Sequence, residues 1–193
     1  RHGSSHAGFN SQPEEVLPKS VDRLIVSAHT KCMRILDTCS ARTGHTAETV
    51  FLRWADPTKW PEWDAEVREV TFEGPARLGA RGRMRPASGP AATFTVIGFE
   101  PERVFTDASS LPGAKLIFEH LVTPIPEGAV VEVTVGVDGP LAPLWQRILG
   151  KKLGNAARSS VAGLLDHLDA AEPAVLGPDV VEVAALAVDP PHF

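Results

Sequence analysis

The sequence predicts one α+β domain in which a curved, seven-stranded antiparallel sheet wraps around a long C-terminal helix, with two short helices after the first strand. Three observations lead to this fold class. Short runs of β-branched and aromatic residues alternate with turn residues between positions 66 and 137. Apolar residues then recur at three-and-four spacing between positions 141 and 170. With 193 residues, the chain has the length of one domain around a single core.

The expected domain begins with a strand and two short helices. The segment Met33–Ala41 mixes apolar and short polar side chains as a strand does, and a Thr-Gly pair interrupts the chain soon after it. Thr46 suits the N-cap position of a short helix that ends near Trp54. Two prolines within Asp56–Asp64 limit the second helix to a brief one.

Six further strands follow, joined by short turns. Because parallel neighbours need a crossover of about a dozen residues, connections this short make the strands antiparallel. Side chains alternate between the two faces of each strand, so Arg81, Arg83 and Arg85 are expected to face solvent together. The strands are expected at Glu66–Glu73, Gly79–Arg85, Ala92–Glu100, Arg103–Ser110, Leu116–Pro124 and Val130–Val137.

From Leu141 to about Ala170, one apolar stripe predicts a single long helix that lies on the sheet. The stripe is bulky at first, with Leu144 and Ile148, whereas Gly150, Gly154, Ala156 and Ala157 make its middle small. A glycine inside a helix costs about 1 kcal/mol relative to alanine, so these small residues need a compensating role. That role is either room for a ligand or close contact between helix and sheet, and the sequence leaves both open.

Two terminal segments are expected outside the domain, which spans residues 33–170. Residues 1–32, rich in Ser, His and Pro, are interpreted as a flexible segment or a cloning remnant. Residues 171–193 form an acidic tail bracketed by prolines, in which Val180–Val188 could dock as a strand.

Composition and charge exclude several classes of protein. No apolar run approaches the roughly 20 residues of a membrane-spanning helix, so no membrane span is predicted. A net charge of −5 argues against a nucleic-acid partner. Cys32 and Cys39 form no C-x-x-C pair, and no signal peptide is recognisable, which favours a reducing, cytoplasmic location. The chain also lacks a nucleophile elbow, a phosphate-binding glycine loop and metal-spaced histidines, so neither a cofactor nor a metal is predicted.

The order of the expected elements resembles the helix-grip fold of the START and polyketide cyclase-like superfamily, also called SRPBCC. The segment Ala47–Asp56, followed by the W-P-x-W turn Trp60-Pro61-Glu62-Trp63-Asp64, is similar to the opening of that superfamily's fold. Its closing hairpin is similar to Phe118–His120 with Val130–Val137, and its entry into the last helix is similar to Gly139–Leu144. The resemblance covers Met33–Ala170.

The resemblance implies a cavity between the sheet and the long helix, and no particular reaction, because the superfamily includes lipid and sterol carriers, hormone receptors and aromatase/cyclases. We therefore expect a small hydrophobic ligand of lipid, isoprenoid or aromatic polyketide-like type. The residues expected to line its site are Trp63, Met84, Phe94, Val96, Phe118, His120, Val133, Val135, Leu149, Leu153, Ala156 and Ala157.

His120 has two interpretations. It is the acid or base of a cyclase or dehydratase that uses the same cavity, or it is a hydrogen-bonded histidine of the core. Asp107 and Ser109, on one face of the preceding strand, are its candidate polar partners. The tryptophans Trp54, Trp60 and Trp63 are expected near the mouth of the cavity, where they close it; alternatively, they plug one end of the core, which is favoured for Trp60 and Trp63.

Two further alternatives concern partners. The chain could be a module that binds another protein through Val180–Val188. The sequence also leaves open assembly as a homodimer.

Overall fold

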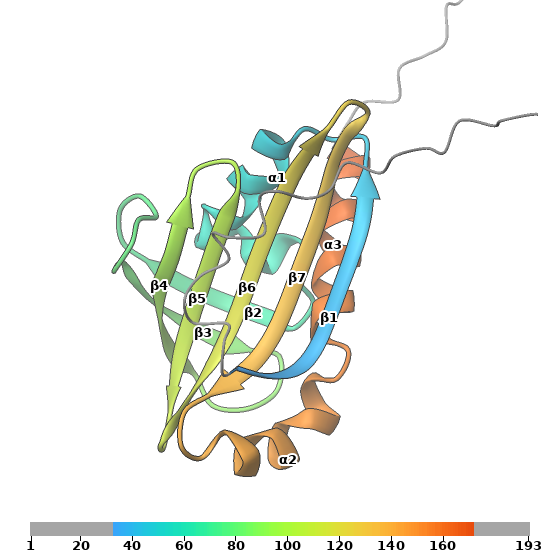
Figure 1. Cartoon of the computed structure of the whole chain (residues 1–193). Coiled ribbons are helices and arrows are strands. Elements are labelled where there is room, and N and C mark those ends of the chain that lie inside the picture. The colour runs from blue at the N-terminus through green and yellow to red at the C-terminus, as the bar shows by residue number, and fades with distance from the viewer. Residues whose placement is uncertain (1–32, 172–193) are drawn as a thin grey trace, which may run out of the picture. The chain divides into compact units, whose positions relative to one another are not determined.

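The computed structural model describes residues 33–171, and its elements follow the predicted order (Figure 1). The expectations for residues 1–32 and for the Val180–Val188 tail lie outside the described residues. None of the helices in the described range is long and apolar enough to cross a membrane. The elements are β1 (Arg34–Thr43), α1 (Ala47–Trp54), the 3-10 helix η2 (Pro57–Glu62), β2 (Val67–Phe72), β3 (Arg81–Pro86), β4 (Ala92–Glu100), β5 (Val104–Leu111), β6 (Ala114–Ile125), β7 (Gly128–Asp138), α2 (Ala142–Leu153) and α3 (Ala156–Ala171).

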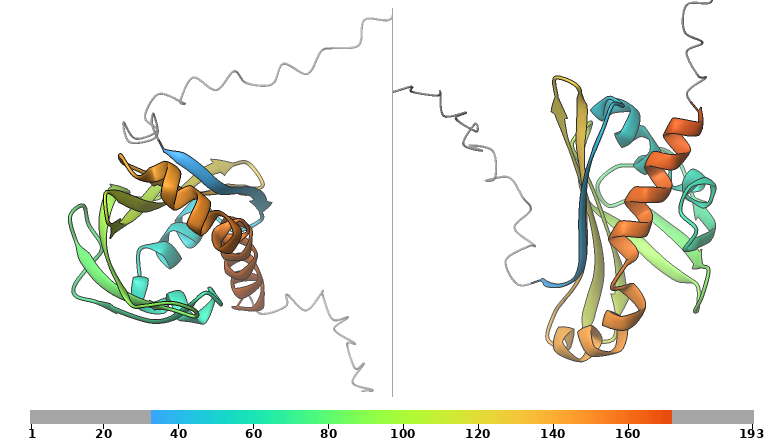
Figure 2. Two further views of the ribbon diagram at one scale, coloured as in Figure 1. Left: turned by 90° about the horizontal axis from the view of Figure 1, so that it is seen from below. Right: turned by 90° about the vertical axis from the view of Figure 1, so that its right-hand side faces the viewer.

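The seven strands form one antiparallel sheet in the order β1-β7-β6-β5-β4-β3-β2. Six strands run as a meander, and β1 joins at its far edge by pairing with β7. The sheet curves, and α3 lies along its concave side (Figure 2). Bulges in β1, β2 and β4 contribute to this curvature, because the extra residue bends a strand and increases its twist. The predicted fold class is confirmed.

The short helices begin and end as their local sequence predicts. The Thr46 hydroxyl accepts a hydrogen bond from the Thr49 N–H at 3.2 Å, which caps α1. After α1, the Trp60 indole N–H donates to the Trp54 carbonyl oxygen at 3.2 Å and holds η2 against α1. Both helices thereby cover one end of the concave face.

The single C-terminal helix of the prediction is wrong: the structure has two helices, α2 and α3, separated at Gly154 and Asn155. The break has a local and a distant cause. Gly150 and Gly154 weaken the helix where it ends. A carboxylate oxygen of Asp37, at the bulge in β1, accepts the backbone N–H groups of Ala157 at 2.8 Å and Arg158 at 3.3 Å, and so caps a new helix start.

The predicted apolar stripe is buried in α3 but not in α2. In α3, Ala157, Val161 and Leu164 are buried in the core. In α2, by contrast, Leu144 and Ile148 keep 51% and 54% of their surface exposed, so the expectation that they lie on the sheet is wrong. The reason is the break at Gly154 and Asn155: α2 and α3 are separate helices, so α2 need not run along the sheet as α3 does.

The core fills the end of the concave face that α1 and η2 cover. Trp54 is fully buried there, and Trp60 stacks on Phe94 with 5.2 Å between ring centroids. The Phe105 and Trp60 rings are nearly perpendicular, with 5.8 Å between their centroids. Arg83 and its neighbours in β3 point to solvent on the opposite face, as alternation predicts.

Candidate ligand site

The predicted site residues differ in exposure, and ten of the twelve fall into two groups. Five of them have almost no accessible surface. A space large enough for water would leave accessible area on the side chains beside it, so these five pack against other atoms. They are Phe94, Val96, Val133, Val135 and Ala157.

The second group is only partly buried and keeps accessible surface. Met84, Phe118, Leu153 and Ala156 are half-buried and pack at the edge of the core, and Leu149 is also half-buried. Val70 and Leu116, which the sequence analysis did not name, have the same character. We call Val70, Met84, Leu116, Phe118, Leu153 and Ala156 the accessible inner face.

Trp63 belongs to neither group. It is buried beside α3, and a side-chain carbon at Gly163 would collide with the Trp63 carbonyl oxygen. The glycine therefore allows α3 to approach the end of η2 closely. This contact favours the interpretation of Trp63 as a plug of the core.

His120 has the surroundings of a core histidine. Its Nδ1 lies 3.1 Å from the Phe105 carbonyl oxygen, and since a carbonyl only accepts, Nδ1 carries the hydrogen. The imidazole lies 5.1 Å from the Trp54 ring and 6.0 Å from the Phe105 ring. Burial lowers the pKa of His120 to about 4, so the ring is neutral at pH 7. These contacts favour the structural interpretation over an acid–base role.

Asp107 is the polar group at the floor of the accessible inner face. Strand register places it between Val96 of β4 and Phe118 of β6, and Val135 of β7 follows Phe118 in the same row. Its side chain is 6% exposed, and Ser109, two residues on, is 8% exposed. Burial raises the pKa of Asp107 to about 7. Both side chains point inward, on the face of the sheet that His120 shares.

Asp107 and His120 are not a hydrogen-bonded pair. Register pairs Asp107 with Phe118 and Phe105 with His120, so the two ionisable groups are diagonal neighbours on adjacent strands. Sequence alternation alone could have singled out Asp107, because an acidic residue at an inward position of a central strand is unusual.

Lys152 connects α2 with the turn between β3 and β4. The Lys152 Nζ donates to the Ser88 carbonyl oxygen at 2.8 Å, which ties the end of α2 to the turn between β3 and β4. Leu153, of the accessible inner face, is the next residue of α2. The contact therefore lies beside the accessible inner face.

Two surface grooves lie elsewhere. One of about 260 Å³ is bordered by α1, η2 and α3, and one of about 150 Å³ lies on the outer side of β2 and β3. Both have charged walls and contain none of the predicted site residues. Among residues 33–171, no cluster of three or more His, Cys, Asp or Glu side chains could hold a metal ion. The lining residues of the larger groove are Leu52, Arg53, Asp56, Lys59, Glu62 and His167.

Comparison with known proteins agrees with this architecture. The sequence model of the family described as polyketide cyclase/dehydrase and lipid transport matches residues 43–171. The chain belongs to this family. The match begins at the end of β1 and ends with α3, so it contains every residue of the accessible inner face.

Several solved structures resemble this member of the polyketide cyclase/dehydrase and lipid transport family. Protein MLL2253 from Mesorhizobium loti matches with a TM-score of 0.58 and 16% identity, over 70% of this chain and 98% of that one. The hypothetical protein jhp0584 from Helicobacter pylori matches with a TM-score of 0.57 and 11% identity, over 86% and 99%. The di-domain ARO/CYC protein StfQ of the steffimycin biosynthetic pathway matches with a TM-score of 0.56 and 13% identity, over 69% and 50%. These identities show a shared fold. The search of curated proteins found no match.

Proposed function

We propose that the protein binds a small hydrophobic molecule at the accessible inner face. The observation that carries this proposal is the set of apolar side chains of the sheet and the C-terminal helices that pack at the edge of the core and still keep accessible surface. Covering such surface is favourable by about 25 cal/mol per Å². The family description, which includes lipid transport, supports a ligand of lipid, isoprenoid or aromatic polyketide-like type.

A cyclase or dehydratase is the second candidate function. The family description and the similarity to StfQ support it. The group suited to proton transfer is then Asp107 rather than His120, because the pKa of Asp107 is about 7 and that of His120 is about 4. Loss of turnover in Asp107→Asn, with turnover kept in His120→Gln, would support this candidate.

The binding proposal is tested by filling the site. Ala156 is half-buried at the edge of the core, so Ala156→Leu should occupy the space and weaken binding of Nile red, a neutral apolar dye, at least tenfold. The melting temperature should stay close to that of the unchanged protein. Ala162→Leu is the matched control, because Ala162 is exposed on the same helix. Equal dye binding by both variants, or no dye binding by the unchanged protein, would contradict the proposal.

The neighbouring position gives the opposite expectation. Ala157 is fully buried, and its backbone N–H is bonded to Asp37, so Ala157 lies at a close contact between α3 and β1. Ala157→Leu should overpack that contact and cost about 1–3 kcal/mol of unfolding free energy. Urea unfolding measures the loss. A stabilised Ala157→Leu would instead place the ligand space beneath this residue.

A further inference from the structure

Asp107 is an acidic side chain in apolar surroundings. The residues paired with it across the sheet are Val96 and Phe118, and the next in the row is Val135. Val96 and Val135 are fully buried, so the carboxyl group has no access to solvent through them. The half-buried Phe118 leaves the accessible inner face as its route to water.

No residue within 33–171 forms a hydrogen bond or an ion pair with the Asp107 carboxyl group. Burial raises its pKa, and no nearby cation lowers it. Buried polar groups are nearly always hydrogen-bonded, because leaving one unpaired costs free energy. A buried carboxyl group without a protein partner therefore calls for a partner from outside the chain.

A second acid in the same row shows the contrast. Asp37 of β1 pairs with Val135 and also points inward, but one of its carboxylate oxygens accepts two backbone N–H groups at the start of α3. Its inward direction is explained by helix capping. Asp107 caps no helix within residues 33–171. Only two strands, β6 and β7, separate it from Asp37 in the sheet.

We propose that Asp107 anchors the ligand, and that the ligand is therefore amphipathic: an apolar body that covers the accessible inner face and a hydrogen-bond-donating group, an amine or a hydroxyl, that reaches the Asp107 carboxyl group. This inference rests on the proposed binding function. A carboxylate-bearing ligand is disfavoured at the same place, because two like charges in apolar surroundings repel each other. The Ser109 hydroxyl, on the same side of β5, is a second acceptor within the floor of the site.

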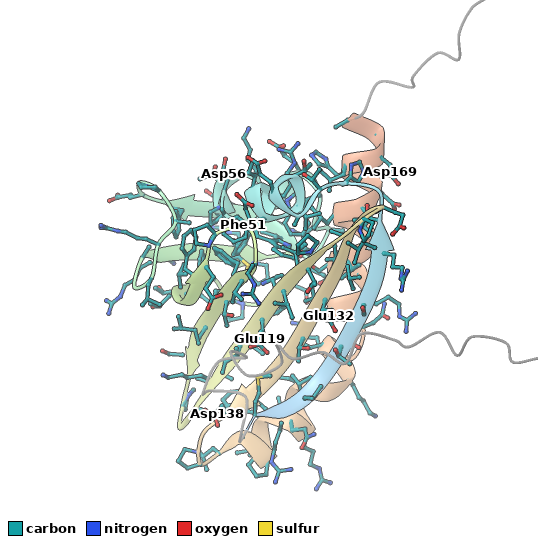
Figure 3. The ribbon with its side chains drawn as sticks, turned by 45° about the horizontal axis from the view of Figure 1, so that its top comes forward. Phe51, Asp56, Glu119, Glu132, Asp138 and Asp169 are labelled. Carbon is teal, nitrogen blue, oxygen red and sulfur yellow. The ribbon has the colours of Figure 1, made fainter. Side chains whose placement is uncertain are left out.

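The test compares probes that share one apolar body. Dodecylamine, dodecan-1-ol and dodecanoate compete with Nile red at pH 8 for the unchanged protein and for two variants. Asp107→Asn keeps the shape of the side chain and removes its charge. Glu132→Gln is the matched control, because Glu132 lies exposed on the outer side of β7, as Figure 3 shows, and alternates with the buried Val131 and Val133.

We expect the unchanged protein to bind the amine at least tenfold more tightly than dodecanoate, with the alcohol between them. Asp107→Asn should bring the three affinities within about threefold of one another and keep Nile red binding, whereas Glu132→Gln should change nothing. An equal affinity of the unchanged protein for amine and dodecanoate would overturn the anchor and leave the binding function standing. Absence of Nile red binding would instead remove the binding function itself. The probe series on the unchanged protein decides the question even if Asp107→Asn does not fold.

Discussion

Asp107 and His120 are buried on the same face of neighbouring strands, and burial moves their pKa values in opposite directions. In both cases burial favours the neutral form. His120 also has a hydrogen bond to the Phe105 carbonyl oxygen and aromatic neighbours, so its place in the core is explained. Asp107 has no hydrogen bond to any residue within 33–171, which makes it the residue whose role points outside the chain.

Asp107 should make the stability of the protein fall as pH rises. Its pKa is 3.8 when unfolded and about 7 when folded, so the folded protein holds a proton that the unfolded chain loses between these values. The free-energy cost of ionising the buried Asp107 carboxyl group therefore lowers the stability from about pH 4 upward, and the loss per pH unit is constant between about pH 4 and pH 7 and ends above about pH 7. Asp107→Asn should stabilise the protein at pH 8 by up to about 4 kcal/mol and by much less at pH 4. Urea unfolding at both pH values measures this, and an equal gain at both would contradict the assigned pKa.

Single residues show what sequence alternation can and cannot establish. It places Phe94, Asp107 and His120 on the inner face, because the side chains of a strand alternate regardless of what covers them. Alternation does not predict that Trp60 covers Phe94 while Phe118 stays accessible, since both phenylalanines occupy inward positions of a strand. Coverage depends on where the helices cross the sheet, and that is set by contacts between distant residues.

At the scale of elements, α1 and the C-terminal helices differ in how much the sequence reveals. The N-cap of α1 is three residues from its bonding partner, so the signal is local and the start of the helix is predicted correctly. The break before α3 cannot be recognised in the sequence, because Leu153, Ala157 and Val161 keep the spacing of one continuous helix across it. The carboxylate that caps α3 is 120 residues away in sequence.

Asp37 should therefore support α3 more than its place in an edge strand suggests. Asp37→Ala removes the acceptor of the Ala157 and Arg158 N–H groups and should cost about 1–2 kcal/mol of unfolding free energy. Asp37→Asn, which keeps an acceptor oxygen, should lose less. Chemical unfolding measures both. If Asp37→Ala were as stable as the unchanged protein, the cap would not be what fixes the start of α3.

On the scale of the whole molecule, the sheet was predictable and the position of the helices on it was not. Short turns fix the meander of β2 to β7, and the alternating faces follow from it. The exposed Leu144 and Ile148 show that an apolar stripe does not by itself fix what a helix lies on. The accessible inner face results from this arrangement, because α2 diverges from α3 beside Leu153 and Ala156.

The contact between Lys152 and Ser88 joins segments 64 residues apart beside that site, and we expect it to slow the release of a bound ligand. Its contribution to stability should be small, because an exposed lysine contact is worth little in water. Opening the site, however, requires α2 and the turn between β3 and β4 to separate. Lys152→Ala should therefore leave the melting temperature nearly unchanged and raise the dissociation rate of Nile red about two- to fivefold in stopped-flow experiments. Lys151→Ala is the control, since Lys151 is exposed and has no such bond within the described residues. Equal dissociation rates for the two variants would show that the ligand leaves by another route.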